Sequence, residues 1–443
     1  MGLMAVLRGS ETARRRLAFA LVALCIGLFT AFGGGKELKD IFENMTSADQ
    51  LTKFSTAFTG PLDRALPVTL IKIDEETRRA WGDEAITPRA PLALLIRMAR
   101  EAKAKAILVD IDFTGDGPGD TSNTDLLGEL AQYPPDAPLL MLVRVLNSGG
   151  TDITPYDHAV EGLANVVWVA AEPEPDRDRV VRKVKLWATQ CKGNDGNTYA
   201  APALQLAALV NGKRAALDAF LADEKDAVCG NAERKAVAWP AGRKQSARVP
   251  YVIWSNADTI GNDFIKQGGA DVALSQNLAA LHLVSYAAPK AEAMGAVSET
   301  LFRDRVAVIG VTHNFTRDIH GTPLGAMPGS VILANTAAMA SYMADTPELS
   351  TLKKYALVVP LFIFLGLIGV RLQLAASTFI VGLLSLALLI VLSRHLGFGS
   401  AVEVMANVLV MYGLFKLADS VVGIVHDWRG GHGWRAILKP HRH

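Results

Sequence analysis

The chain has 443 residues and a formal net charge of +1, and half of its residues are hydrophobic. A soluble α/β protein is usually less apolar, and the near-neutral charge excludes a global basic field that would attract nucleic acid. The apolar excess lies at the two ends of the chain, so the sequence predicts membrane-spanning segments around a hydrophilic middle region.

The first apolar run, Leu17 to Phe32, directly follows the arginines Arg14 to Arg16. A basic region before an apolar stretch is typical of a cleavable signal peptide or of an uncleaved signal anchor. The glycines that follow contain no clear Ala-x-Ala cleavage site, which favours the anchor. We expect residues 1–35 to form a cytoplasmic N-terminus and a first transmembrane helix.

Three further apolar runs lie close together near the C-terminus: Tyr355–Val370, Leu374–Leu392 and Val404 to about Val425. Such a cluster predicts a helical hairpin followed by one more helix, and we assign the three helices to residues 351–426. With the first helix, the chain would cross the membrane four times, which places both termini on the same side.

Basic residues near the spans indicate which side this is. Arginines precede the first span, and the tail after the last span is also basic, whereas Lys353 and Lys354 oppose this bias mildly. Positive charge favours the cytoplasm. We therefore expect a multi-pass protein of the bacterial inner membrane, with both termini cytoplasmic, residues 36–350 periplasmic or extracellular, and a basic cytoplasmic tail over 427–443.

Lys416 and Asp419 interrupt the last apolar run and are three residues apart, so they share one face of a helix and could pair. One interpretation is a polar contact to a partner helix. The alternative is that both side chains reach the membrane interface near the helix end.

Residues 36–350 alternate between apolar runs and amphipathic stretches, which predicts an α/β fold with a mostly parallel sheet flanked by helices. The alternating residues 180–187 predict an exposed or edge strand, and the polar segment 211–245 predicts an excursion from the core. Buried strands are expected over 68–74, 106–113, 139–145, 166–170 and 305–311, and helices over 75–80, 91–103, 124–132, 201–210 and 331–342.

The middle region contains Cys191 and Cys229, while Cys25 lies in the first apolar run. Two cysteines in an exported domain can form a disulfide. Sequence does not give their separation in space, so two free thiols remain the alternative.

Ordered short motifs in the middle region resemble a known family. Residues 69–75, the pair Pro88-Arg89 and residues 104–113 are similar to the first half of the CHASE domain of the second type. This is an extracytoplasmic sensor domain that occurs beside cyclases and histidine kinases. Residues 175–183 resemble its acidic turn, which ends in an arginine, here Arg182. Its closing signature is matched by residues 306–310, Asp318, Thr322-Pro323, Met327-Pro328-Gly329 and Ala334-Asn335.

The layout of one helix, an exported domain and three helices also resembles this family, but the sequence departs from its pattern in places. Residues 85–89 replace a Trp-Pro-Trp-like stretch, and Leu333 stands where a histidine is frequent. If these positions line a ligand pocket, we expect this chain to bind a ligand other than the usual one, or none. Family members commonly continue into an output domain, whereas the seventeen residues of 427–443 are too few to fold as an enzyme.

Candidate ligand-binding residues follow from the rule that open α/β sheets bind ligands at the carboxyl ends of their strands. Polar side chains follow several predicted strands, and an arginine could neutralise an acid among them. The alternative is that these side chains cap helices and satisfy turns. The candidates are Asp74, Arg89, Asp110, Asp112, Thr312 and Asp318.

No motif assembles a nucleophile, a base and an orienting group: the chain has no nucleophile elbow, Walker loop, His-Glu-x-x-His or Cys-x-x-Cys. Residues 112–123 partly resemble a calcium loop, but Asn123 replaces its bidentate glutamate, and a solvated acidic turn is the favoured interpretation. We therefore expect no enzyme activity, no cofactor and no metal site.

Two functions are favoured, and an enzyme with an unrecognised site among Asp74, Asp112 and His313 is a third, weaker hypothesis. The first is a membrane-anchored sensor that binds a small molecule or a periplasmic protein and signals through a separate cytoplasmic protein, with a homo-oligomer as a compatible arrangement. The second is a non-catalytic structural or docking subunit of a cell-envelope assembly, which the departures at 85–89 and Leu333 favour.

Overall fold

The computed structural model describes only part of the chain. The four expected spans, apart from Pro360 and Leu384, lie outside the described residues, as do Cys25, the pair Lys416–Asp419 and most of the acidic loop. Among the helices described, none combines the length and hydrophobicity that a membrane span needs. The described residues are 65–82, 86–113, 123–146, 154–192, 195–230, 232–233, 245–249, 251, 271–272, 281–285, 302–313, 318–341, 360 and 384.

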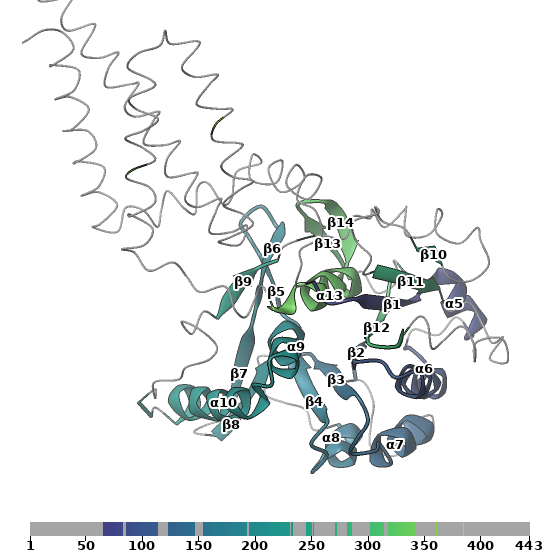
Figure 1. The fold of residues 1–443 in the computed structure, drawn as a ribbon, viewed down its shortest axis with the longest axis horizontal. Helices are drawn as coiled ribbons and strands as arrows, with labels where there is room; N and C mark the ends of the chain where they lie inside the picture. Colours follow the sequence, from purple (N-terminus) through teal and green to yellow (C-terminus); the bar gives the residue numbers. More distant parts are fainter. Residues whose placement is uncertain are drawn as a thin grey trace, which may run out of the picture. The chain divides into compact units, whose positions relative to one another are not determined.

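A seven-stranded sheet forms the centre of the compact unit Asp49–Pro347, in the order β10–β11–β1–β12–β2–β3–β4 (Figure 1). All neighbouring strands are parallel except β10, which is antiparallel to β11. The predicted mostly parallel sheet is thus confirmed. The strands are β1 (Val68–Ile73), β2 (Ala106–Asp110), β3 (Leu139–Arg144), β4 (Val166–Ala170), β10 (Asp271–Val272), β11 (Leu281–Ser285) and β12 (Val306–Val311).

The strand β12 comes last in the sequence but lies between β1 and β2. Its register places Gly310 between Lys72 of β1 and Asp110 of β2. Residues from both ends of the domain sequence therefore meet at the carboxyl end of the sheet.

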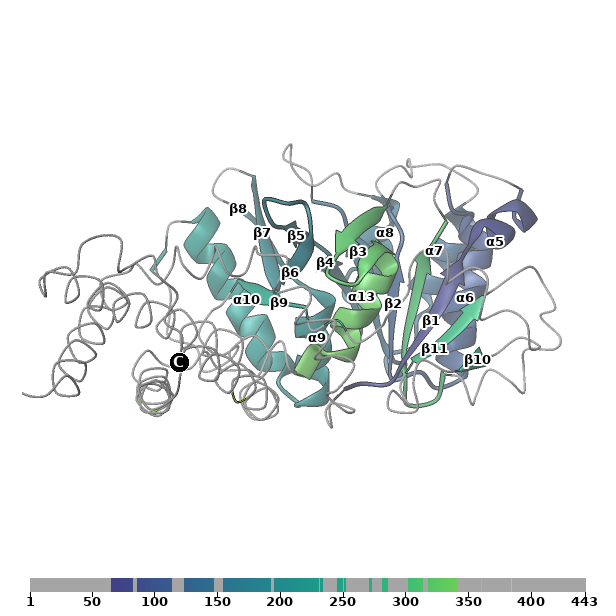
Figure 2. The same ribbon diagram turned by 90° about the horizontal axis from the view of Figure 1, so that it is seen from above.

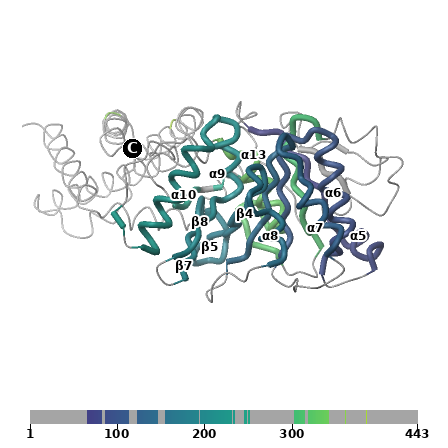
Figure 3. Tube along the Cα trace, turned by 90° about the horizontal axis from the view of Figure 1, so that it is seen from below, coloured from purple at the N-terminus to yellow at the C-terminus, as the bar shows by residue number. Residues whose placement is uncertain are grey.

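Helices cover both faces of this sheet because its strand residues alternate between two apolar clusters. Leu108 and Val308 pack toward α9 (Pro202–Val210) and α13 (Gly329–Ala338), whereas Ile107 and Ile309 pack toward the opposite layer. Figures 2 and 3 view these two layers from opposite sides. The opposite layer consists of α6 (Arg89–Glu101), α7 (Thr124–Ala131) and α8 (Pro155–Val160), and the short α5 (Glu75–Ala80) follows β1.

Smaller antiparallel sheets extend the domain beyond β4. The strands β5 (Pro173–Pro175), β6 (Val181–Lys185) and β9 (Ser246–Arg248) form a sheet in which β6 is central. Of the two alternatives for 180–187, an exposed or an edge strand, the edge strand was therefore wrong. A central strand also alternates polar and apolar residues when only one face of its sheet is buried.

A long amphipathic helix, α10 (Arg214–Cys229), packs against the hairpin of β7 (Trp187–Lys192) and β8 (Asp195–Ala200). Its residue Phe220 is buried and meets Trp187 edge-to-face, with ring centroids 4.9 Å apart. The prediction that all of 211–245 is an excursion from the core was therefore wrong for this helix. The residues Leu217, Phe220 and Cys229 are buried in this helix, which a polar average over the whole segment conceals.

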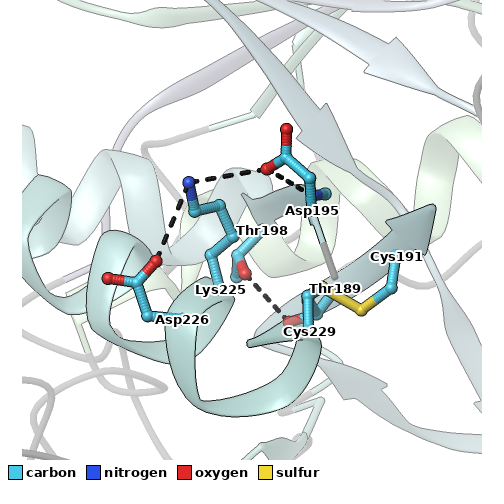
Figure 4. Close-up of a disulfide and its surroundings, with 8 residues drawn as sticks. Thr189, Cys191, Asp195, Thr198, Lys225, Asp226 and Cys229 are labelled. Carbon is cyan, nitrogen blue, oxygen red and sulfur yellow. Dashed lines mark hydrogen bonds and ion pairs between the residues drawn. A yellow bond between two sulfur atoms is a disulfide. The ribbon is translucent and has the colours of Figure 1, made fainter. Parts of the chain in front are cut away.

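A disulfide joins Cys191 of β7 to Cys229 at the end of α10. Figure 4 shows this link beside two polar contacts, the hydroxyl pair Thr189–Thr198 across the hairpin and the ion pair of Lys225 with Asp195. The disulfide and the Lys225–Asp195 pair attach the outer helix to the hairpin, and the hydroxyl pair joins the two strands of the hairpin.

The hairpin of β13 (Ile319–Thr322) and β14 (Gly325–Pro328) leads directly into α13. The Thr322 hydroxyl donates to the carbonyl of Gly325 and accepts from the amide of Leu324, which fixes the turn. The hairpin thereby sets the direction in which α13 begins.

Candidate functional site

A cavity of about 530 Å³ lies at the carboxyl ends of β2, β3, β4 and β12. The first turns of α9 and α13, the strand β6 and residues before α6 complete its wall. This is the edge of a parallel sheet at which α/β proteins bind ligands, and the volume is within the usual range for small-molecule sites.

Four of the six candidate residues line this cavity: Arg89, Asp110, Asp112 and Asp318. They are brought together because β12 lies beside β2, and because the chain then returns through Asp318 toward α13. The strand order therefore assembles an acid–arginine group from segments about two hundred residues apart.

The structure places Asp74 and Thr312 elsewhere. The carboxylate of Asp74 caps α5, where it accepts from the Thr77 amide at 2.9 Å and the Thr77 hydroxyl at 2.8 Å. The Thr312 amide donates to the carbonyl of Ile73. Neither residue lines the cavity, and the role of Asp74 is the helix cap that the sequence left open as an alternative.

Asp318 and His320 form a polar pair beside the first residue of α13. The His320 Nε2 lies 2.7 Å from the Asp318 Oδ1, and this hydrogen bond raises the pKa of His320 against the opposing effect of burial. A Cβ at Gly329 would lie 2.2 Å from the Asp318 carboxylate. Glycine is therefore required at the helix start for the carboxylate to fit.

Asp110 ends β2 and faces the same part of the cavity. Burial first, and then the negative charge of Asp318, raise the pKa of Asp110 to about 7. A Cβ at the neighbouring Gly310 would lie 2.4 Å from the Cβ of Ser330 and 3.3 Å from that of Asp110. Glycine at 310 thus lets α13 approach the sheet closely enough to place the two carboxylates near each other.

Arg89 is buried at the start of α6. Its Nη2 donates to the carbonyl oxygen of Asp112 at 2.9 Å, and its guanidinium carbon lies 5.0 Å from the ring centroid of Phe113. These contacts fix the segment after β2, so Arg89 supports the wall that carries Asp112.

A second ion pair belongs to the lining, where Lys185 Nζ of β6 is 2.5 Å from Glu172 Oε2. Both residues line the cavity. Both side chains are partly exposed, so this pair contributes little to the stability of the fold. We infer that its role is to position β6.

The acidic turn noted in the sequence lies outside the cavity but supports it. Arg182, only 1% exposed, binds both carboxylate oxygens of Asp178 and one of Asp176, at 2.8 to 2.9 Å. Val180 in the same turn bridges to Gly321 of β13. The turn therefore holds the strand that carries His320.

Most of the remaining lining is apolar, including Val143, Val184, Ile332 and Leu333. Two large apolar lining residues are exposed to solvent, Ile86 at 55% and Val145 at 43%. An organic ligand would cover apolar surface here as well as polar groups. Within the described residues, no group of three or more His, Cys, Asp or Glu side chains is arranged to hold a metal ion.

The sequence analysis did not select His320, Glu172 or Lys185. The signal for His320 was its spacing, since residues two apart in an extended segment share a face and Asp318 was already a candidate. No local pattern marked Glu172 and Lys185, which belong to different segments and meet only in the folded chain.

Comparison with known proteins gives one match. A family model described as the CHASE2 domain matches residues 19–370. No curated protein and no solved structure matches the chain significantly.

Proposed function

The chain belongs to the CHASE2 domain family, whose model matches most of its length, and on this premise we propose that it is a membrane-anchored receptor for a small molecule. CHASE2 domains are a family of extracytoplasmic sensor domains. In this proposal, the domain binds its ligand outside the cytoplasm and passes the change to a separate output protein.

The observation that carries the proposal is the cavity at the carboxyl end of the sheet. It joins carboxylates, an arginine and a histidine to a largely apolar wall, which is the composition of small-molecule sites. The residues at which the chain departs from the family pattern, Ile86, Thr87 and Leu333, also line this cavity. We infer that this protein recognises a ligand different from that of members with tryptophan and histidine there.

The proposed route of transmission starts at α13, which forms part of the cavity wall. The carbonyl of Ala338, at the end of this helix, accepts from the amide of Leu66 at 2.8 Å. Leu66 follows the first predicted span and Ala338 precedes the later ones. A ligand-dependent shift of α13 would thus act on both connections to the membrane.

Purification of the tagged full-length protein from its native membrane in a mild detergent tests the proposal. We expect a substoichiometric kinase, cyclase or similar output protein to be recovered with it. An assembly of fixed stoichiometry with other envelope proteins would contradict the receptor and favour the docking subunit.

A cavity-filling variant tests whether the cavity controls the output. Ala171 lines the cavity, and Ala171→Phe should occupy it and hold the activity of the recovered output protein in one state. Ala216→Phe, on the exposed side of α10, is the matched control and should behave as the wild type. An unchanged ligand response in Ala171→Phe would contradict the proposal.

A further inference from the structure

The charges that line the cavity fall into three groups. Lys185 is paired with Glu172, and Arg89 lies against the carbonyl of Asp112 and the ring of Phe113. The third group contains two carboxylates, Asp110 and Asp318, and one imidazole, His320.

Within the third group, Asp318 is engaged by His320, whereas no described residue donates a hydrogen bond to the carboxyl of Asp110. Asp110 is partly buried, and the negative charge of Asp318 raises its pKa while the neighbouring His320 lowers it. A buried carboxylate without a donor is costly. Because His320 is engaged by Asp318, Asp110 is the carboxyl of this group that a further cation with hydrogen-bond donors could bind.

The walls around this group are apolar. Val143, Ile332 and Leu333 line the cavity, and Ile86 and Val145 leave apolar surface exposed to solvent along it. Covering such surface with an apolar group favours binding. An ion without an organic body would leave this surface uncovered.

We propose that the cavity binds a small organic ammonium ion, with its nitrogen between Asp110 and Asp318 and its apolar body against Val143, Ile332 and Leu333. This inference rests on the proposed function and names the ligand class of the same site. An ammonium group supplies the donors that Asp110 lacks, and such charge-assisted hydrogen bonds are about twice as strong as neutral ones.

The same geometry disfavours an organic anion. A carboxylate ligand in this position would meet the negative charges of Asp110 and Asp318. The guanidinium of Arg89 already lies over the Phe113 ring and donates to the Asp112 carbonyl. A neutral ligand would supply no opposite charge and so would not favour the ionised form of Asp110.

Three probes of similar shape separate these possibilities: 2-phenylethylammonium, 2-phenylethanol and 3-phenylpropanoate. Their binding to the full-length protein in detergent is measured by titration calorimetry. We expect the ammonium probe to bind at least about tenfold more tightly than the alcohol, and the carboxylate to bind most weakly.

Substitution of Asp110 tests the contact itself. Asp110→Asn keeps the shape of the side chain and should lower the affinity for the ammonium probe by about tenfold. The affinity for the alcohol should change by less than about twofold. Asp218→Asn, an exposed acid on α10, is the control and should leave both affinities unchanged. The thermal unfolding of each variant establishes that it is folded.

The ammonium assignment is overturned if the alcohol or the carboxylate binds as tightly as the amine, or if Asp110→Asn binds the amine normally. Either result leaves a cavity that binds small molecules and hence the proposed receptor intact. If no probe binds at millimolar concentration, the ammonium class is overturned, and the effect of Ala171→Phe on the output then decides the receptor proposal separately.

Discussion

At the residue scale, Asp110 shows how the fold changes the chemistry of an ordinary side chain. It has lost much of its water at the end of β2 and faces Asp318 across the cavity. Burial and this neighbour raise its pKa from 3.8 to about 7. Between about pH 4 and pH 7 the folded protein thus holds a proton that the unfolded chain releases.

This difference predicts the direction of the pH dependence. The contribution of Asp110 to stability is fully present below about pH 4 and is lost as the pH rises toward 7, by at most about 1.4 kcal/mol per pH unit. Asp110→Asn should reduce the change of melting temperature with pH over this range, whereas Asp218→Asn should leave that change as in the wild type. Thermal unfolding of the full-length protein from about pH 4 to 8 measures this, and an unchanged slope in Asp110→Asn would contradict it.

Arg182 is the residue whose loss should be most costly outside the cavity. Arg182→Met leaves Asp176 and Asp178 without their partner and should destabilise the protein by about 3 kcal/mol. Arg177→Met, in the same turn but exposed, should change stability by less than about 0.5 kcal/mol. Denaturant unfolding compares the two, and equal effects would show that the ion pair does not hold the turn.

At the element scale, the contact between β12 and α13 depends on Gly310. In Gly310→Ala the new Cβ would meet Ser330 at 2.4 Å, so the helix must move away from the sheet. We expect a loss of about 1–3 kcal/mol.

The matched control for this substitution is Gly128→Ala. In the middle of α7 a Cβ meets nothing within 4 Å, so alanine should stabilise the helix by about 0.5–1 kcal/mol. Chemical denaturation of both variants distinguishes a steric effect at 310 from a general effect of adding a methyl group. A change in the free energy of unfolding with the same sign in both variants would contradict the steric explanation.

The disulfide between Cys191 and Cys229 should act locally on α10. Serine at both positions should cost about 2–4 kcal/mol and accelerate amide exchange in α10, while α6, on the other side of the sheet, keeps its protection. Hydrogen exchange followed by mass spectrometry resolves the two helices. Equal protection of α10 with and without the disulfide would show that packing of Phe220 is sufficient.

The buried parallel strands were predictable because runs such as residues 106–109 are continuous and apolar. The antiparallel hairpins were not, since β8 contains Asp195, Gly196 and Asn197 and is fixed by its pairing with β7. The helix α10 was missed for a related reason: only Leu217, Phe220 and a few neighbours are buried. Tertiary contacts define these elements more than local preference does.

The sequence indicated which types of residue would form the candidate site. It did not indicate which of the candidates would line the cavity. Asp74 and Asp110 both follow or end buried strands, and nothing local distinguishes them. The insertion of β12 beside β2 places Asp110 in the cavity with Asp318, while Asp74 begins α5 and caps it. Strand order, which the sequence did not give, makes this distinction.

At the scale of the whole molecule, the cavity and the two chain connections of the domain share α13. Its first turn meets Asp318 and Ser330 lies against Gly310, and its end is hydrogen-bonded to Leu66. One helix therefore links the cavity to both segments that lead toward the predicted spans. Such an arrangement suits a receptor in which occupancy of the cavity changes helix packing.

The central claim, that this cavity holds a small molecule, is tested most directly by mass spectrometry of the compounds that the full-length protein retains through purification. The account predicts a compound, an organic amine, that is released on denaturation from the wild type and from Ala216→Phe but not from Ala171→Phe. The same compounds released equally from all three proteins would contradict it.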